Sequence, residues 1–298
     1  RKASRDAPFN DHEILERLEQ AITSKQVVAV AALAGWGKTT ALAQWAQQTV
    51  LPVAWYTLDS TDRDPCQFLD YVLASAEPYV PGVAELLQRL AGTSPQALPD
   101  LFRQAALLVA AVPKPFALVL DDFHVLEDET LPVLPGSELI FEFLAKIAEY
   151  ATNCHLVLTS RMLPNIQGLA RLIAQRRAVF FDYAVLQWSA DDIQQLALSS
   201  TGVQLSPANA EQLALHMNGW VTGIILSLDQ DVRTPQPVFD LAADASHVYA
   251  FFAEQMAGRH AHVLEEQRAA ADGALAVAVE AAARDAGQRE RHEQRRHA

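Results

Sequence analysis

The chain has 298 residues, of which 50% are hydrophobic and 20% charged, and it carries a formal net charge of −13. This length and apolar content allow one large core or two smaller ones. The acidic balance argues against direct binding of nucleic acid, which needs clustered lysine and arginine to neutralise phosphates. The sequence contains no run of 18 uncharged apolar residues, so we expect neither a membrane span nor a membrane partner.

The N-terminal residues 1–10 lack the apolar centre of a signal peptide, which favours a cytoplasmic location. They begin without methionine, and we expect the sequence to be part of a longer chain. Cys66 and Cys154 lie far apart without the spacing of metal ligands, so they are expected to be reduced structural thiols. Between Arg284 and Arg296, arginine alternates with acidic residues, which favours a solvated helix or frayed tail over a DNA contact.

The first predicted element is a helix that ends at about Thr23. Asn10 and Glu13 match a helix-capping pattern, and apolar residues then recur at helical spacing. The apolar run that begins at Val27 predicts a buried strand, which leads through a glycine-containing loop into a helix over Ala41–Gln48. This order can hold an anion, because loop amides and the positive end of the helix dipole point toward it.

The loop matches the phosphate-binding pattern Gly-x-x-x-x-Gly-Lys-Ser/Thr except at its first position, which is Ala32. Alanine disfavours positive φ, so either the loop enters with ordinary backbone angles or the match is accidental. Lys38 would reach the β- and γ-phosphates of a nucleoside triphosphate, and the Thr39 hydroxyl would ligate Mg²⁺. The residues expected to bind the nucleotide here are Ala34, Gly35, Trp36, Gly37, Lys38, Thr39 and Thr40.

The next stretch is expected to supply one strand and three helices. Leu51–Leu58 is the strand, and Cys66–Ala76 is a helix whose inward side carries Phe68, Leu69, Val72 and Leu73. Prolines punctuate the region that follows, which contains a helix over Val83–Leu90. A further helix over Leu101–Val112 leads into the next strand.

A continuous apolar run over Phe116–Leu120 ends in two acids, which is the Walker B pattern of nucleotide-binding proteins. On such a strand Asp121 can hold Mg²⁺ through water, and Asp122 can orient the water that attacks the γ-phosphate. Paired acids after a strand are by themselves more often a solvated turn. Because a phosphate-binding loop lies upstream, the Walker B interpretation is favoured here. His124, just past the acids, is expected to serve packing rather than phosphate contact.

The pattern of alternating strands and helices continues to residue 181. Glu138–Ala151 is expected to be a helix, and His155–Thr159 a buried strand that ends beside the phosphate loop. Arg161 at its tip could sense a γ-phosphate, although a surface salt bridge is the alternative. Ala178–Phe181 completes a sheet of five strands. The sequence therefore predicts a doubly wound α/β domain over residues 25–187, preceded by the helix in residues 1–24.

The pattern changes after residue 187. Ser189 and Asp192 form a capping box for one helix, and Ser206 caps a second that ends at Gly219. We expect these helices to form a small lid domain over residues 188–232. Residues 233–298 would hold a linker and an apolar helix around 248–256, then an alanine- and arginine-rich tail with few large aliphatic residues.

Four segments, in the same order, resemble the motifs of the MalT-like, LuxR-associated STAND NTPases, a group related to the AP-ATPases and NACHT proteins. The resemblance covers residues 9–228, and this family commonly lacks glycine at the position of Ala32. The four segments are Ala34–Thr40, Val119–His124, Leu158–Pro164 and Asn218–Gly223.

The resemblance implies a P-loop domain with strand order 5-1-4-3-2, a helical domain, and a winged-helix domain that is truncated or atypical in residues 233–298. It also implies an ATP/ADP switch in which ADP holds a closed monomer and ATP favours self-association. Arg161 falls on the family's sensor position. Val221 falls where the family usually has proline near the adenine, and Trp220 beside it is expected to be a core anchor. The sensor and effector domains would lie outside this sequence.

We therefore expect a regulatory ATPase module with Lys38, Asp122 and Arg161 as catalytic residues and Thr39 and Asp121 as Mg²⁺ ligands. Two alternatives remain. One is a phosphotransferase that passes the γ-phosphate to a small acceptor, although no acceptor-binding cluster is evident. The other is a nucleotide-binding scaffold that does not hydrolyse ATP.

Overall fold

The structure is a computed structural model that describes residues 12–128 and 130–231. Its strands are β1 (Val27–Ala31), β2 (Val53–Thr57), β3 (Phe116–Asp121), β4 (Cys154–Ser160) and β5 (Ala178–Phe181). They form one parallel sheet with the order β2-β3-β4-β1-β5, which confirms the predicted doubly wound fold and strand order.

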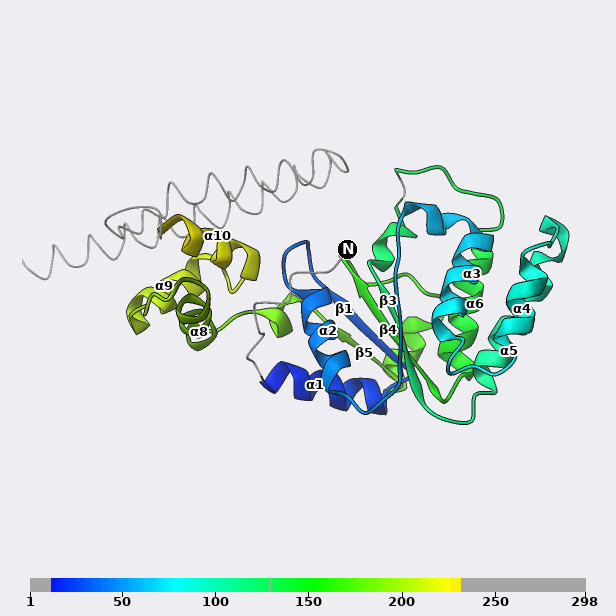
Figure 1. Ribbon diagram of the computed structural model, residues 1–298, viewed down its shortest axis with the longest axis horizontal. Coiled ribbons are helices and arrows are strands. Elements are labelled where there is room, and N and C mark those ends of the chain that lie inside the picture. The colour runs from blue at the N-terminus through cyan, green and yellow to red at the C-terminus, as the bar shows by residue number, and fades with distance from the viewer. Residues whose placement is uncertain (1–11, 129, 232–298) are drawn as a thin grey trace, which may run out of the picture. The chain divides into compact units, whose positions relative to one another are not determined.

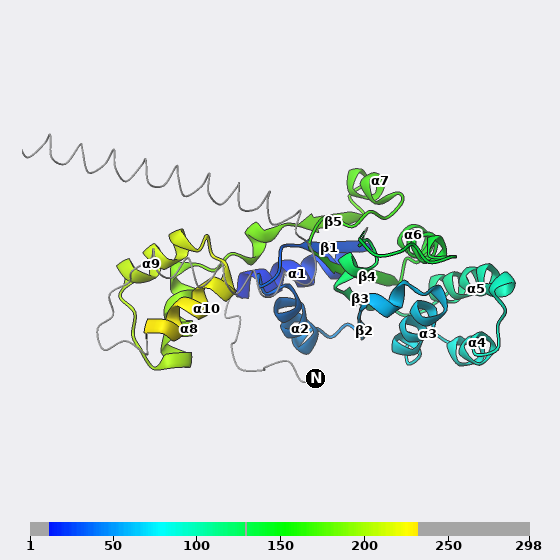
Figure 2. The ribbon, with the colours of Figure 1, turned by 90° about the horizontal axis from the view of Figure 1, so that it is seen from above.

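Helices cover both faces of this sheet. Figure 1 shows α1 and α2 on one side and α3 to α6 on the other, and Figure 2 shows the same arrangement from above. Short 3₁₀ turns occur at η1 (Ser60–Arg63), η2 (Pro95–Ala97), η3 (Phe123–Val125) and η4 (Tyr183–Leu186). The helices in this part are α1 (His12–Ser24), α2 (Lys38–Gln48), α3 (Pro65–Ala76), α4 (Val83–Leu90), α5 (Leu98–Ala110), α6 (Glu138–Tyr150) and α7 (Leu169–Ala174).

The central strands are buried because both of their faces are covered. Every residue of β1 and β3 is buried, as their uninterrupted apolar sequences predict for parallel strands. The edge strand β2 instead carries partly exposed residues. Ala31 at the end of β1 pairs with Ser160 at the end of β4, so the residues that follow these two strands emerge side by side. The polar residues predicted from separate strands therefore meet at one edge of the sheet.

Three further helices follow, namely α8 (Ala190–Thr201), α9 (Pro207–His216) and α10 (Val221–Asp231), in the segment predicted to form a lid. They belong to the same compact unit as the sheet. The capping box between Ser189 and Asp192 and the cap at Ser206 are present as predicted. The predicted linker, the helix around 248–256 and the tail lie outside the described residues, as does the Asn10 cap.

Most predicted elements are confirmed within three residues, but two helices were missed, and α2 and α5 each begin three residues earlier than expected. The P-loop helix α2 starts at Lys38 rather than Ala41. The missed helices are α7 and α10. The first turn of α10 contains Thr222 and Gly223, which are poor helix formers. Gly223 is needed because a Cβ there would lie 2.4 Å from the Trp220 ring, so tertiary packing outweighs local propensity.

No helix within residues 12–128 and 130–231 is long and apolar enough to cross a membrane. Both cysteines are free thiols: Cys154 is buried at the start of β4, and Cys66 is exposed on α3.

Candidate functional site

The loop between β1 and α2 has the backbone shape of a phosphate cradle. Gly35 and Gly37 adopt φ angles of 78° and 82°, a left-handed conformation that glycine adopts readily. Gly37 immediately precedes α2, so the helix N-terminus opens onto the loop. Ala32, where the motif expects glycine, does not have a positive φ, and its N–H donates to the Ser160 carbonyl at 3.2 Å. The loop thus enters with ordinary angles, which alanine tolerates.

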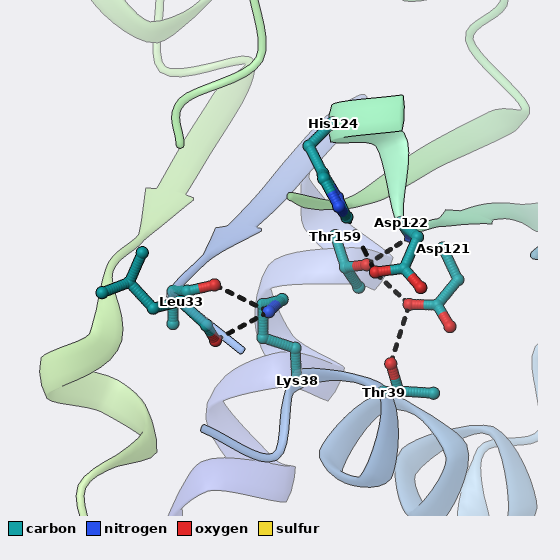
Figure 3. A network of polar contacts seen from close by, with 8 residues as sticks. Leu33, Lys38, Thr39, Asp121, Asp122, His124 and Thr159 are labelled. Carbon is teal, nitrogen blue, oxygen red and sulfur yellow. Dashed lines mark hydrogen bonds and ion pairs between the residues drawn. The ribbon is translucent and has the colours of Figure 1, made fainter. Parts of the chain in front are cut away.

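Lys38 lies folded over this loop. Its Nζ donates to the carbonyl oxygens of Ala32 at 2.6 Å and Leu33 at 3.0 Å, as Figure 3 shows. Burial lowers the pKa of Lys38, whereas the carboxylates of Asp122 and Asp121 oppose that shift. The ammonium group is therefore anchored at the mouth of the loop by carbonyl groups and held near two acids. Phosphate oxygens placed there would meet a preoriented positive charge.

A chain of hydroxyl groups links the loop to the first acid of β3. The Thr39 hydroxyl donates to Asp121 Oδ1 at 3.0 Å, and the Thr159 hydroxyl donates to the same oxygen at 2.5 Å. The Thr159 oxygen also accepts the N–H of Asp122 at 2.8 Å. One buried hydroxyl on β4 thus fixes the carboxylate of the first acid and the backbone of the second (Figure 3).

Asp122 has an unusual backbone. Its φ of 61° is left-handed, which is uncommon for a residue other than glycine, although aspartate tolerates it better than most. Its side chain is 44% exposed, and His124 Nδ1 lies 3.7 Å from its Oδ1. The two adjacent acids therefore differ in environment. Asp121 is buried under the loop, and Asp122 reaches toward open space where a water or phosphate could stand.

A cavity of about 510 Å³ lies above the loop, a size in the usual range for small-ligand sites. On one side the cavity is lined by the phosphate loop, by Asp122 and by Arg161, which follows β4. On the other side lie Trp188, in the connection between η4 and α8, and the first turns of α10. The residues that line it are Ala34, Gly35, Gly37, Lys38, Thr39, Thr40, Asp122, Arg161, Trp188, Val221, Thr222 and Ile225.

Most of the residues predicted for the site therefore come together, with two differences in placement. Asp121 does not line the cavity, but it accepts a hydrogen bond from Thr39, which does. The Trp36 side chain points elsewhere, with its ring 5.1 Å from that of Tyr183, and is not part of the lining. Trp220 is buried, as expected of a core anchor, and its indole N–H donates to the Ala34 carbonyl at 3.2 Å.

Sequence reasoning missed Thr159, Trp188 and Thr222. Thr159 had a detectable signal, because a hydroxyl at the end of a buried strand is rarely left without a polar partner. It is also two residues before Arg161, which directly follows the end of β4. Trp188 carries no such signal. Thr222 lies in the segment Asn218–Gly223 that resembles a family motif, but only the packing of α8 to α10 shows that it contacts the loop.

The residues at this edge fit a magnesium ion bound with a nucleotide. Mg²⁺ prefers oxygen ligands and is usually held by one or two protein side chains together with phosphates and waters. Thr39 offers a hydroxyl oxygen beside the loop, and Asp121 offers a carboxylate directly behind it. These two residues would hold the ion, which would neutralise charge on the phosphates.

Asparagine at position 121 is expected to raise the free energy of unfolding of the nucleotide-free protein at pH 7.5. Burial raises the pKa of Asp121, so at neutral pH the ionised carboxylate destabilises the folded state relative to the unfolded chain. The gain should shrink as the pH falls through the raised pKa toward 3.8, because wild-type Asp121 then becomes protonated and neutral like asparagine. Urea unfolding at pH 7.5 and 4.5 measures both effects.

Asp100→Asn is the matched control for this prediction. Asp100 is a partly exposed side chain paired with Arg103, and these contacts lower its pKa instead of raising it. Its replacement should give no gain in stability at neutral pH. A loss of stability in Asp121→Asn at pH 7.5 would contradict the expected cost of the buried charge.

No protein-family model matches the chain. A curated protein with clear similarity is the HTH-type transcriptional regulator MalT of Cronobacter sakazakii, which is 28% identical over 229 residues. The match covers 76% of this chain and 24% of the relative, so the chain spans about a quarter of the relative's length.

Two solved structures share the fold. A Walker-type ATPase of Pyrococcus abyssi aligns with a TM-score of 0.53 and 12% identity over 90% of this chain and 77% of its own. A signal transduction ATPase with numerous domains (STAND) from Pyrococcus horikoshii, which carries a tetratricopeptide repeat sensor, aligns with a TM-score of 0.50 and 15% identity. That alignment covers 84% of this chain and 33% of the other. The chain is thus similar in sequence to the MalT regulator and shares its fold with a Walker-type ATPase and a STAND protein.

Proposed function

We propose that the chain is the cytoplasmic nucleotide switch of a MalT-like transcriptional regulator, which binds ATP or ADP with Mg²⁺ and hydrolyses ATP slowly. The observation that carries this proposal is the hydrogen bond of 3.0 Å between Thr39 and Asp121. It brings a hydroxyl of the phosphate loop next to the acid that ends β3, which supports the proposal that both oxygens hold one magnesium ion. Lys38, Asp122 and Arg161 surround the same space.

Each residue has a distinct role in this proposal. Lys38 pairs with the β- and γ-phosphates, and Thr39 and Asp121 hold the metal ion. Asp122 orients or polarises the attacking water, since its carboxylate is the exposed one of the two acids. Arg161 contacts the γ-phosphate and thereby distinguishes ATP from ADP, which its place in the cavity lining supports.

The base would lie on the apolar side of the cavity. Trp188, Val221 and Ile225 face the loop there, and an adenine ring needs flat apolar surroundings of this kind. Val221 takes this role in place of the usual proline. In this arrangement the nucleotide contacts α10 as well as the loop. Nucleotide affinity therefore depends on the position of α10.

Nucleotide binding can supply the energy for switching. A ligand at a thousand times its dissociation constant for one state stabilises that state by about 4 kcal/mol. This is enough to make it the main state even when the other state is moderately favoured without ligand. The proposal includes an ADP-bound resting state and an ATP-bound state that self-associates, with sensor and effector domains elsewhere in a longer protein.

Two measurements test the proposal. The nucleotide that copurifies with the protein is identified by mass analysis, and calorimetry then measures ATP and ADP binding with and without Mg²⁺. Bound ADP or Mg²⁺-dependent ATP binding is expected, and the absence of heat with adenine and guanine nucleotides would overturn the proposal. Single-turnover phosphate release then separates a hydrolysing switch from a scaffold. A phosphorylated acceptor among the products would point to a phosphotransferase.

Thr159→Val is expected to lower the rate of ATP hydrolysis by about tenfold while ATP affinity changes less than threefold. Valine keeps the shape of the buried side chain but removes the hydroxyl that fixes Asp121 and the Asp122 backbone. Thr159→Ser restores the hydroxyl and should recover most of the rate. Steady-state phosphate release and calorimetry measure the two quantities. A wild-type rate in Thr159→Val would show that this hydroxyl does not position the acids.

A further inference from the structure

Three consecutive loop residues, Ala34, Gly35 and Trp36, are held from outside the loop by the segment between η4 and α10. The Trp220 indole donates to the Ala34 carbonyl at 3.2 Å. The Thr222 hydroxyl donates to the Gly35 carbonyl at 2.8 Å, and the Thr222 backbone N–H donates to the same oxygen at 3.2 Å. The contact of Trp36 with Tyr183 adds a ring pair.

The bond from the Thr222 backbone serves both partners. Thr222 is the second residue of α10, where the first N–H groups of a helix have no partner within the helix. The Gly35 carbonyl satisfies one of them. In return, the helix start fixes the orientation of a peptide group inside the phosphate loop.

The fit between Gly35 and the helix is close. A Cβ at position 35 would lie 2.5 Å from the Thr222 hydroxyl oxygen and 2.9 Å from the Trp220 indole nitrogen. Glycine is therefore required here for two reasons, namely its left-handed φ angle and the close approach of α10. The second reason is independent of phosphate binding and shows that the loop and the start of α10 are shaped to each other.

The orientation of these carbonyls matters for anion binding. A loop binds phosphate when successive N–H groups converge on it, and the peptide carbonyls then point the other way. Such carbonyls need donors of their own when they are partly buried. Trp220 and Thr222 supply donors to two of them, so they favour the loop shape that an anion requires.

From these contacts we infer that Trp220 and Thr222 are positioning residues for the phosphate loop, through which docking of α10 raises the affinity for nucleotide. The inference rests on the proposed function and deepens it, because it names the contacts that couple the nucleotide to the helical segment. Coupling of this kind is reciprocal, so bound nucleotide must in turn stabilise the docked helix. Neither residue needs to touch the nucleotide for this effect.

Thr222→Val tests the inference in the full 298-residue chain. Valine has the same shape and keeps the backbone N–H that donates to Gly35, but it lacks the hydroxyl donor. Without nucleotide, amide hydrogen exchange at residues 35–38 should become about fivefold faster, the effect of losing one hydrogen bond. Exchange in β3 should not change. With Mg²⁺, calorimetry should show ADP and ATP affinities that are about fivefold weaker.

Two further variants separate positioning from a general effect on stability. Thr222→Ser keeps the hydroxyl and should restore both exchange and affinity. Ser227→Ala is the matched control, because it removes a buried hydroxyl from the same helix that donates to the Gly223 carbonyl and does not touch the loop. It should leave exchange at residues 35–38 and nucleotide affinity at wild-type values.

The outcomes are distinguishable. Wild-type exchange and affinity in a folded Thr222→Val would overturn the inference. If Thr222→Val does not fold, Trp220→Phe, which removes the indole donor and keeps a smaller aromatic ring, gives the same comparison with the same criteria. If wild type binds no nucleotide, the proposed function fails, and the exchange experiment alone still decides whether α10 positions the loop.

Discussion

Alanine at position 38 is expected to weaken the binding of Mg²⁺-ATP and ADP by at least about 100-fold. Lys38 supplies a positive charge that the carbonyl oxygens of Ala32 and Leu33 hold over the loop. Hydrogen bonds from a charged donor to phosphate contribute about 1.5–3 kcal/mol each, and Lys38 can make two of them. Isothermal calorimetry at fixed ionic strength measures the change.

Lys25→Ala is the matched control for Lys38→Ala. The Lys25 ammonium also donates to a backbone carbonyl, that of Arg176, but it does so away from the cavity. Its removal changes the net charge by the same amount and should leave nucleotide affinity within twofold of wild type. Equal affinity in the wild type and in Lys38→Ala would remove the basis for placing phosphates at this loop.

The fold could be predicted because its signals are local. The strands that form the centre of the sheet are unbroken apolar runs, and most of the predicted helices carry a capping residue or a periodic apolar pattern. The order of the strands came from the resemblance to a known family instead. The start of α2 was placed too late because Lys38, Thr39 and Thr40 were assigned to the loop, whereas Gly37 already precedes the helix.

The candidate site was predicted only in part, for a physical reason. Lys38, Thr39, Asp121 and Asp122 have chemistry that their own motifs reveal, and the parallel sheet brings those motifs to one edge. Thr222 acts through a contact between segments 187 positions apart, which no local pattern encodes. The same limit applies to Trp36. It stands within the motif, but packing against Tyr183 determines where its ring points.

Asp122→Asn is expected to lower the rate of ATP hydrolysis at least about 100-fold while ATP affinity stays within threefold of wild type. Removal of a group that orients or deprotonates a reacting water commonly costs two or more powers of ten. Asparagine keeps the size of the side chain and can still accept a hydrogen bond, but it cannot polarise water as a carboxylate does. Phosphate release under single-turnover conditions measures the chemical step.

The geometry makes this prediction specific to the second acid. Asp122 is the exposed member of the pair, and its carboxylate accepts no bond from Thr39 or Thr159, which both donate to Asp121. Loss of its charge should therefore leave the metal ligands in place. Asp182→Asn is the control, because Asp182 also follows a strand of the sheet but caps η4 and does not line the cavity. It should hydrolyse ATP at the wild-type rate.

The pattern of results assigns the role of Asp122. If Asp122→Asn loses binding and hydrolysis together, the carboxylate acts in holding the metal and nucleotide, and Asp121 is not the principal metal ligand. If it loses neither, the water must be oriented by another group, and His124, whose Nδ1 lies 3.7 Å from Asp122 Oδ1, is the candidate. Only loss of hydrolysis with retained binding agrees with the proposed switch. The lifetime of the ATP-bound state is then set by how well Asp122 activates the attacking water.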